Sequence, residues 1–312
     1  MQNIYLPEGQ YSPDKTPDAY CSDEKSLYKA MAEKRIICGR AILCDKNMNL
    51  TVDIGCGIVG YMPRNEAVFQ PDGSSIKDIA VLTRVGKSVC FHINSIVTEN
   101  GRRVAYISRA SAQMECYRNY ISKLTQGDII PCKITHTEQF GAFADIGCGL
   151  VALLPVDCIS VSRIERPDER FSVGDELRCV VRSIDETTGR VFISTKELFG
   201  TWEENSRAFL PGQTVSGIIR SVEPYGVFIE LSPNLAGLAE YSPDVRAGDT
   251  AAVYIKSINA EKMKIKLVIV SSSSAPIEKK APEYYVLPDV KHMDVWKYSP
   301  DVCSKTVQTV FN

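Results

Sequence analysis

Several features that mark other classes of protein are missing from this 312-residue sequence. No run approaches the roughly 18 consecutive apolar residues that a membrane-spanning helix needs, and the longest apolar runs have the length of strands. The first residues lack the basic region and apolar stretch of a secretory signal. With 44% hydrophobic and 24% charged residues, the composition is that of a soluble globular protein. We therefore expect a cytoplasmic protein that makes no membrane contact.

Motifs for metal binding and catalysis are equally scarce. The eleven cysteines form no CxxC pair and only three histidines are present, so we expect free, mostly buried thiols, no metal and no cofactor. The sequence holds no P-loop, GxSxG or HExxH motif. Residues 55–60 spell GxGxxG, but Pro63 follows where the dinucleotide-binding motif needs a helix. We expect no enzyme activity and no small-molecule substrate.

The charge of the chain is close to neutral overall but unevenly distributed. The net charge of −2 gives no general attraction to nucleic acid. Residues 34–120 hold 12 basic and 7 acidic residues, residues 126–200 hold 8 and 12, and residues 211–271 hold 6 of each. The first 33 residues hold 3 basic and 6 acidic residues. Any affinity for nucleic acid must therefore come from local patches and depend on salt.

An internal repeat organises the sequence. Residues 51–57 (TVDIGCG) recur as residues 143–149 (FADIGCG) at an offset of 92, and a proline follows each copy. A third, looser copy aligns residues 224–228 (PYGVF) with residues 139–143 (QFGAF) at an offset of 85. Differences in length fall in one connection, as expected for homologous units that share a variable surface loop. The sequence therefore predicts three copies of one unit.

The pattern within a unit is that of short strands. Five strands in roughly 70 residues bury little as an open sheet, which favours a small closed barrel. Between the units, residues 110–123 and 196–209 have helical spacing. In the second unit, the runs that are β-branched or alternating and are bounded by turn residues lie at 129–135, 142–146, 150–154, 176–184 and 191–194.

The order of these motifs resembles the S1 RNA-binding domain, named after bacterial ribosomal protein S1. The matching features of the second unit are Phe-Gly-Ala-Phe, Gly-x-Gly-Leu-Val, Val-Gly-Asp-Glu-Leu and Ser-Ile-Asp. The resemblance implies an all-β protein of tandem five-stranded OB-fold (S1-type) barrels joined by short helical linkers. The expected domains are a polar N-terminal extension (1–33), a divergent S1-type repeat 1 (34–110), repeat 2 (126–196), repeat 3 (211–271) and a C-terminal extension (272–312), which is rich in aromatic residues.

The resemblance also implies that an exposed barrel face holds single-stranded RNA. A base stacks on an aromatic ring for about 1–3 kcal/mol whatever the sequence, and a glycine between two aromatics lets a strand bend and approach a ligand. The alternative for each aromatic is a place in the core, and for each cation a solvated side chain. The candidate RNA-binding residues are Phe140, Phe143, Lys133, His136, Arg182 and Arg190 in repeat 2, and Tyr225, Phe228, Lys256 and Lys264 in repeat 3.

The first repeat departs from this pattern. Met48 and Thr51 stand where the aromatics are expected, and Asn49 replaces the glycine. Asparagine often occupies positions with positive φ, so we expect Asn49 to keep the bend without the stacking surface. By analogy with the leading repeats of ribosomal S1 proteins, this repeat is a candidate for contact with the small ribosomal subunit. Contact with the RNA backbone is the open alternative.

Three functions fit these observations. The first is a non-catalytic protein of the ribosomal S1 type that binds single-stranded RNA, including mRNA, during translation. The second is an S1-repeat accessory factor of RNA decay or transcription. The third is a protein-interaction scaffold whose barrels have lost RNA affinity, which the acidic second repeat and the divergent first repeat favour. The C-terminal extension either docks against a barrel or binds a partner.

Overall fold

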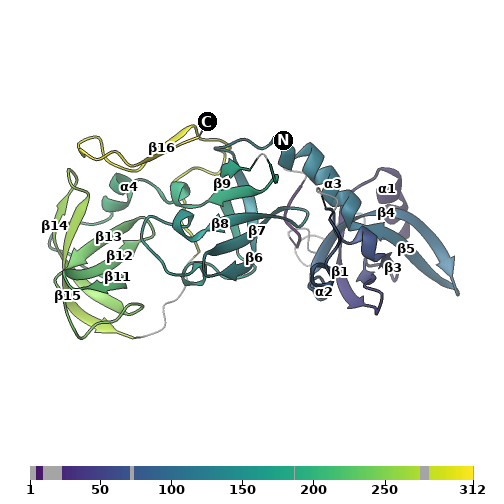
Figure 1. Cartoon of the computed structure of the whole chain (residues 1–312), viewed down its shortest axis with the longest axis horizontal. Helices are drawn as coiled ribbons and strands as arrows, with labels where there is room; N and C mark the ends of the chain where they lie inside the picture. Colours follow the sequence, from purple (N-terminus) through teal and green to yellow (C-terminus); the bar gives the residue numbers. More distant parts are fainter. Residues whose placement is uncertain (1–4, 10–22, 71–73, 186, 275–280, 312) are drawn as a thin grey trace. The chain divides into compact units, whose positions relative to one another are not determined.

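The computed structural model describes residues 5–9, 23–70, 74–185, 187–274 and 281–311. Within them, fifteen strands form three closed five-stranded barrels, which Figure 1 shows as successive segments of the chain. Each barrel has the same strand order, in which the fifth strand lies between the third and the fourth. The structure confirms the predicted all-β fold of tandem five-stranded barrels with short helices between them.

The bounds of the strands repeat from barrel to barrel. The first barrel consists of β1 (Ile37–Cys44), β2 (Leu50–Asp53), β3 (Val59–Met62), β4 (Ser88–Glu99) and β5 (Arg102–Ser108). The second consists of β6 (Ile129–Glu138), β7 (Gly141–Gly147), β8 (Leu150–Pro155), β9 (Glu176–Ile184) and β10 (Val191–Ser194). The third consists of β11 (Thr214–Glu223), β12 (Gly226–Ser232), β13 (Leu235–Ala239), β14 (Thr250–Asn259) and β15 (Lys264–Ser273).

The barrels close because every strand finds a partner on both sides. In the third barrel, β11 pairs with β12 and β14 in antiparallel fashion, and β13 pairs with β15 in parallel. Closure removes the unpaired edges that would otherwise recruit another chain. Alternation places Ile265 and Leu267 of β15 in the core, whereas Lys264 and Lys266 point outward. The sequence pattern of period two therefore sets which side chains face solvent.

Short helices connect and flank the barrels, and local capping explains where they begin. They are α1 (Glu24–Ala32), α2 (Asp78–Leu82), α3 (Arg109–Asn119) and α4 (Trp202–Ser206). The Ser108 side chain accepts a hydrogen bond from the N–H of Ser111 and so caps α3. Thr201 and Glu204 form a capping box at α4. No helix among the described residues is long and apolar enough to cross a membrane.

The chain divides into two compact units. The first contains Met1–Leu124, Pro131–Lys133 and Asp145–Val151, and the second contains Thr125–Ile130, Ile134–Ala144 and Ala152–Asn312. The second barrel thus contributes residues to both units. The first unit has a continuous apolar core, which includes Leu27 of α1 and Phe91 of β4.

A buried ionic cluster lies in the first unit. The Arg109 guanidinium donates to both carboxylate oxygens of Glu8, at 2.6 and 3.0 Å. Asp145 accepts hydrogen bonds from the main-chain N–H groups of Glu8, Gly147 and Gly149. Burial, followed by the nearby Glu8 carboxylate, raises the pKa of Asp145 to about 7. Its repeat equivalent, Asp53, is exposed, so the aspartate of the Asp-Ile-Gly-Cys-Gly sequence is buried in one repeat and exposed in the other.

The second unit holds parts of the second barrel, the third barrel and the C-terminal extension. Glu230 of β12 accepts hydrogen bonds from Arg170 at 2.7 and 2.9 Å and from Arg220 at 2.7 Å. Burial opposes ionisation of Glu230, but the two guanidinium groups lower its pKa overall. The cluster thus connects Arg170, which precedes β9, to β11 and β12 of the third barrel, and removing one member would leave a buried charge unpaired, which is costly.

Candidate nucleic-acid interface

The predicted aromatic pairs have the same geometry in the second and third barrels. The ring centroids of Phe140 and Phe143 are 6.1 Å apart and their planes are at 90°. The corresponding values for Tyr225 and Phe228 are 6.1 Å and 86°. Phe140 is 58% exposed and Tyr225 is 70% exposed, so one ring of each pair is freely available for stacking. Phe143 and Phe228 are half-buried.

The strand pattern explains why the second ring of each pair points outward. In β7, Ala142 and Ala144 are buried on either side of Phe143. In β12, Val227 and Ile229 are buried on either side of Phe228. Neither ring is therefore part of a barrel core, which is the outcome that the stacking hypothesis requires.

The glycine between the aromatics is needed for space. A Cβ on Gly141 would lie 2.6 Å from the main-chain oxygen of Leu154, and φ at Gly141 is not positive. The expectation that Asn49 keeps a positive φ at this position is wrong, since the left-handed residue is Met48, with φ of 63°. Asn49 instead fixes the β1–β2 turn, where its N–H and its amide donate to the Asp45 carboxylate.

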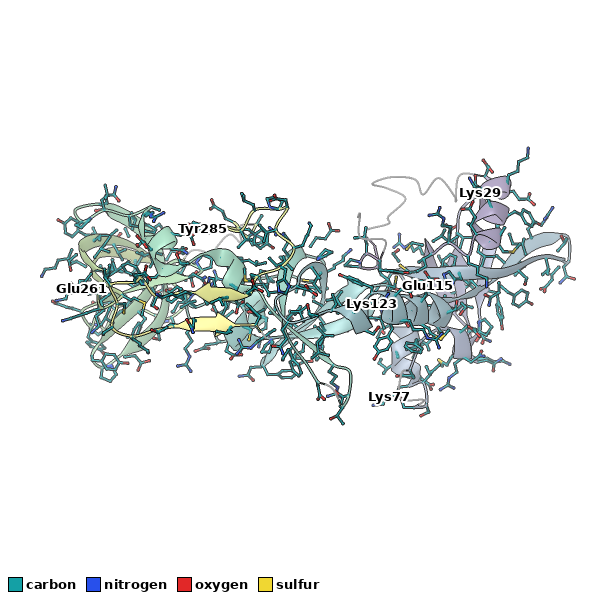
Figure 2. The ribbon with its side chains drawn as sticks, turned by 90° about the horizontal axis from the view of Figure 1, so that it is seen from above. Lys29, Lys77, Glu115, Lys123, Glu261 and Tyr285 are labelled. Atoms are coloured by element: carbon teal, nitrogen blue, oxygen red, sulfur yellow. The ribbon has the colours of Figure 1, made fainter. Side chains whose placement is uncertain are left out.

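In the third barrel, the four predicted residues Tyr225, Phe228, Lys256 and Lys264 line one groove of about 940 Å³. The floor of the groove is formed by β13 and β15, including Leu238, which pairs with Phe228 across the strands. Lys262 and Met263 of the lining belong to the β14–β15 turn, which Figure 2 marks at Glu261. The two aromatics and the two cations are thus brought to one surface, although they are up to 39 positions apart in the sequence.

Sequence reasoning missed three further lysines of this groove. Lys262, Lys266 and Lys305 also line it, and Glu240 is the one acidic residue in its lining. Among the described residues, none of these lysines takes part in an ion pair, and all are exposed. The alternation of lysine with apolar residues over 262–267 was a usable signal for the first two. Lys305 comes from the C-terminal extension, and no local signal placed it here.

The predicted RNA-binding residues of the second barrel differ from one another in exposure and in contacts. His136 stacks on Phe143, with ring centroids 6.2 Å apart and planes at 22°, and its Nε2 lies 2.6 Å from the Glu138 carboxylate. Arg190 is exposed on the β9–β10 turn. Arg182 is half-buried, and its Nη1 is buried without a hydrogen-bond partner among the described residues.

Lys133 belongs to the first unit. A Cβ on Gly9 would lie 2.8 Å from its Nζ, so its ammonium is beside the N-terminal segment. This contact makes Lys133 a weaker candidate for RNA than the lysines of the third barrel.

The first barrel carries a different aromatic pair. Tyr61 of β3 and Tyr106 of β5 are paired across the strands, with centroids 5.5 Å apart and planes at 73°. Thr51, which replaces the expected aromatic, pairs with Tyr61 on the next strand. The Tyr106 hydroxyl donates to Glu99 at 2.8 Å, and this hydrogen bond raises the pKa of Tyr106. In the first barrel, β2 thus carries Thr51 at the position of Phe143, and the two tyrosines lie on β3 and β5.

Four cysteines of the first unit lie close together. Cys38 and Cys90 are buried cross-strand partners in the first barrel, with sulfur atoms 2.9 Å apart. The thiols of Cys116 and Cys90 hydrogen bond to Cys148 and lower its pKa to about 5. Within the described ranges, no group of three or more candidate ligands could hold a metal ion. Cys148 and its equivalent Cys56 both have positive φ, in tight turns between strands.

The family comparison agrees with the geometry of the second barrel. Residues 123–196 match the model of the S1 RNA binding domain. The second barrel is thus similar to an S1 RNA binding domain. The matched S1 domain includes all five strands of the second barrel and the aromatic pair Phe140 and Phe143.

Relatives in sequence match more of the chain than the family model does. The small ribosomal subunit protein bS1 of Staphylococcus aureus is 29% identical over 62% of this chain and 48% of the relative. A bS1 homolog of Bacillus cereus is 26% identical over 84% of this chain and 66% of the relative. The chain therefore spans about half to two thirds of these proteins. A solved multidomain protein with nucleic acid binding domains from Streptococcus pneumoniae is 14% identical, covering 76% of this chain and 74% of that chain, with a TM-score of 0.24.

Proposed function

We propose that this chain is a non-catalytic protein of the ribosomal S1 type, which binds single-stranded RNA in the cytoplasm and acts on mRNA during translation. The observation that carries the proposal is the groove of the third barrel, where the exposed Tyr225 and the half-buried Phe228 lie beside five lysines. An aromatic ring can stack on any base, and a lysine ammonium can donate to any phosphate, so the groove suits an unpaired strand of varied sequence. The names of the bS1 relatives support the ribosomal part of the proposal.

The third barrel is the stronger of two RNA-binding faces in this proposal. Its groove has five lysines and a single acidic residue. In the second barrel, by contrast, Glu138 lies beside His136 and would repel a phosphate there. Phe140 and Phe143 can still stack bases, so the second barrel extends the site rather than forming it.

The first barrel has a separate role in the proposal, as a contact with a protein of the small ribosomal subunit. The observation that favours protein contact is its exposed apolar side chains, with Ile42 at 51%, Leu43 at 57% and Val59 at 41% exposure. Co-purification of ribosomal subunits that survives nuclease treatment would support this role. Recovery of decay or transcription enzymes instead would favour the accessory factor.

Fluorescence anisotropy of the full chain with a labelled 12-nucleotide pyrimidine-rich RNA tests RNA binding. The decisive variant replaces Phe140, Phe143, Tyr225 and Phe228 with alanine. Each stacked base contributes about 1–3 kcal/mol, and the variant removes the stacking rings of both barrels, so the loss of two or more stacked bases should weaken binding at least tenfold.

Tyr254→Ala is the matched control, because Tyr254 is an exposed tyrosine of β14 that does not line the groove. The control should bind RNA as the unmodified chain does. Equal affinity of the quadruple variant would refute the stacking mechanism, and absence of binding at low salt would favour the protein scaffold.

A further inference from the structure

The C-terminal extension forms a strap, defined here as residues 284–311, that is anchored on the second barrel. The N–H of Ile129 donates to the main-chain oxygen of Lys291 at 2.8 Å, and the N–H of Met293 donates to that of Gly127 at 3.0 Å. The strap thus adds main-chain hydrogen bonds at the start of β6. Arg178 of β9 donates to the main-chain oxygens of Val286, Leu287 and Val290.

The same strap is anchored on the third barrel. The Tyr298 hydroxyl donates to the main-chain oxygen of Asn234 at 2.6 Å, and the N–H of Trp202 donates to the oxygen of Tyr298 at 3.0 Å. Trp296 and Tyr298 are buried in the core cluster of the third barrel. Burial raises the pKa of Tyr298, which keeps the hydroxyl protonated as a donor. The strap is therefore a packed part of this unit, and Tyr285, labelled in Figure 2, lies near its start.

The hairpin of the strap reaches the groove of the third barrel. β16 (Val295–Lys297) pairs with β17 (Gln308–Val310), and the connection between them contributes Lys305 and Val307 to the groove lining. Lys305 is exposed and has no ion pair among the described residues. Lys297, by contrast, is paired with Asp301 and does not line the groove. The hairpin thus presents one unpaired cation to the groove.

A loop of the second barrel completes the wall beside the strap. Val161 and Ser162 line the groove, and the N–H of Val161 donates to the Asn234 side chain at 3.0 Å. Asn234 is thus bound both by this loop and by Tyr298 of the strap. The lining of the groove comes from four parts of the chain: this loop, Trp202 of α4, the third barrel and the strap.

We propose that the strap is part of the RNA site, with Lys305 as a phosphate-binding residue that the isolated third barrel would lack. This inference rests on the proposed function, because the phosphate is that of the stacked single strand. The paired strands of the hairpin hold the main chain at Lys305 beside the groove before RNA arrives, so only the side chain must be ordered on binding. The strap therefore lengthens the path of the bound strand beyond the barrel.

The test measures the affinity of the full chain for a labelled 12-nucleotide oligouridylate at 50 and 200 mM salt. One phosphate contact on a single strand contributes a slope of about 0.7, so Lys305→Gln should weaken binding about eightfold at 50 mM and about threefold at 200 mM. Lys305→Arg should bind as the unmodified chain does, because it keeps the charge. Lys297→Gln is the matched control and should change nothing.

The outcomes separate this inference from the proposed function. Normal binding by Lys305→Gln, together with loss of binding by the quadruple aromatic variant, would overturn the role of the strap and leave RNA binding intact. Failure of the unmodified chain to bind the probe would overturn both. A loss in Lys305→Gln that Lys305→Arg does not restore would also contradict a phosphate contact, since it would indicate a structural role.

Discussion

Replacing Lys256, Lys264 and Lys266 with glutamine would test whether the groove of the third barrel neutralises phosphates. All three side chains are exposed and line the groove, so the fold should tolerate the change. Each phosphate contact on a single strand releases counterions and adds about 0.7 to the slope of log affinity against log salt. If all five groove lysines make such contacts, the slope is about −3.5, and affinity falls roughly 130-fold between 50 and 200 mM salt.

The triple variant should retain two contacts, with a slope of about −1.4 and a fall of only about sevenfold over the same range. The assay is anisotropy of the full chain with single-stranded RNA at four or more salt concentrations. Arg246→Gln combined with Lys291→Gln is the control, because both cations are exposed and lie outside the groove lining. A triple variant with the slope of the unmodified chain would refute the assignment of the phosphates to this groove.

Three further predictions concern stability. Between about pH 4 and pH 7, the folded chain holds a proton on Asp145 that the unfolded chain has lost, so the free energy of unfolding of the first unit should fall as pH rises through this range. Asp145→Asn should remove this pH dependence, as measured by urea unfolding followed by circular dichroism, whereas the control Asp53→Asn should leave it in place. Tyr298→Phe should destabilise the second unit by about 1 kcal/mol through a lost hydrogen bond, measured by urea unfolding with tryptophan fluorescence, and an unchanged midpoint would contradict the anchoring of the strap. Gly141→Ala should lower the thermal midpoint, because the added Cβ would collide with a main-chain oxygen of β8. A midpoint equal to that of the unmodified chain would contradict the close approach of β8 to Gly141.

Local signals were enough to predict the barrels and the aromatic pairs. The strands of the second barrel lie where alternation and turn residues placed them, because both signals act over a few residues. The repeat offsets then related Phe140 and Phe143 to Tyr225 and Phe228, and their ring geometries agree to within a few degrees.

Other features depend on tertiary partners that no local pattern contains. Asp53 and Asp145 are followed by the same four residues, Ile-Gly-Cys-Gly, but only Asp145 is buried, because the N-terminal segment with Glu8 covers it. Asn49 was expected to be left-handed, whereas the glycine at the equivalent position is required by the close approach of another strand. Lys305 reaches the groove only because the strap is anchored on two barrels.

We propose that single-stranded RNA lies along the groove of the third barrel and against Phe140 and Phe143 of the second barrel. The most direct measurement is ultraviolet crosslinking of the full chain to a uridine-rich RNA, followed by mass spectrometry of the crosslinked peptides. We expect crosslinks at Tyr225 or Phe228, with weaker crosslinks at Phe140 or Phe143, since stacked bases would lie against these rings. Crosslinks confined to residues outside both faces would contradict it.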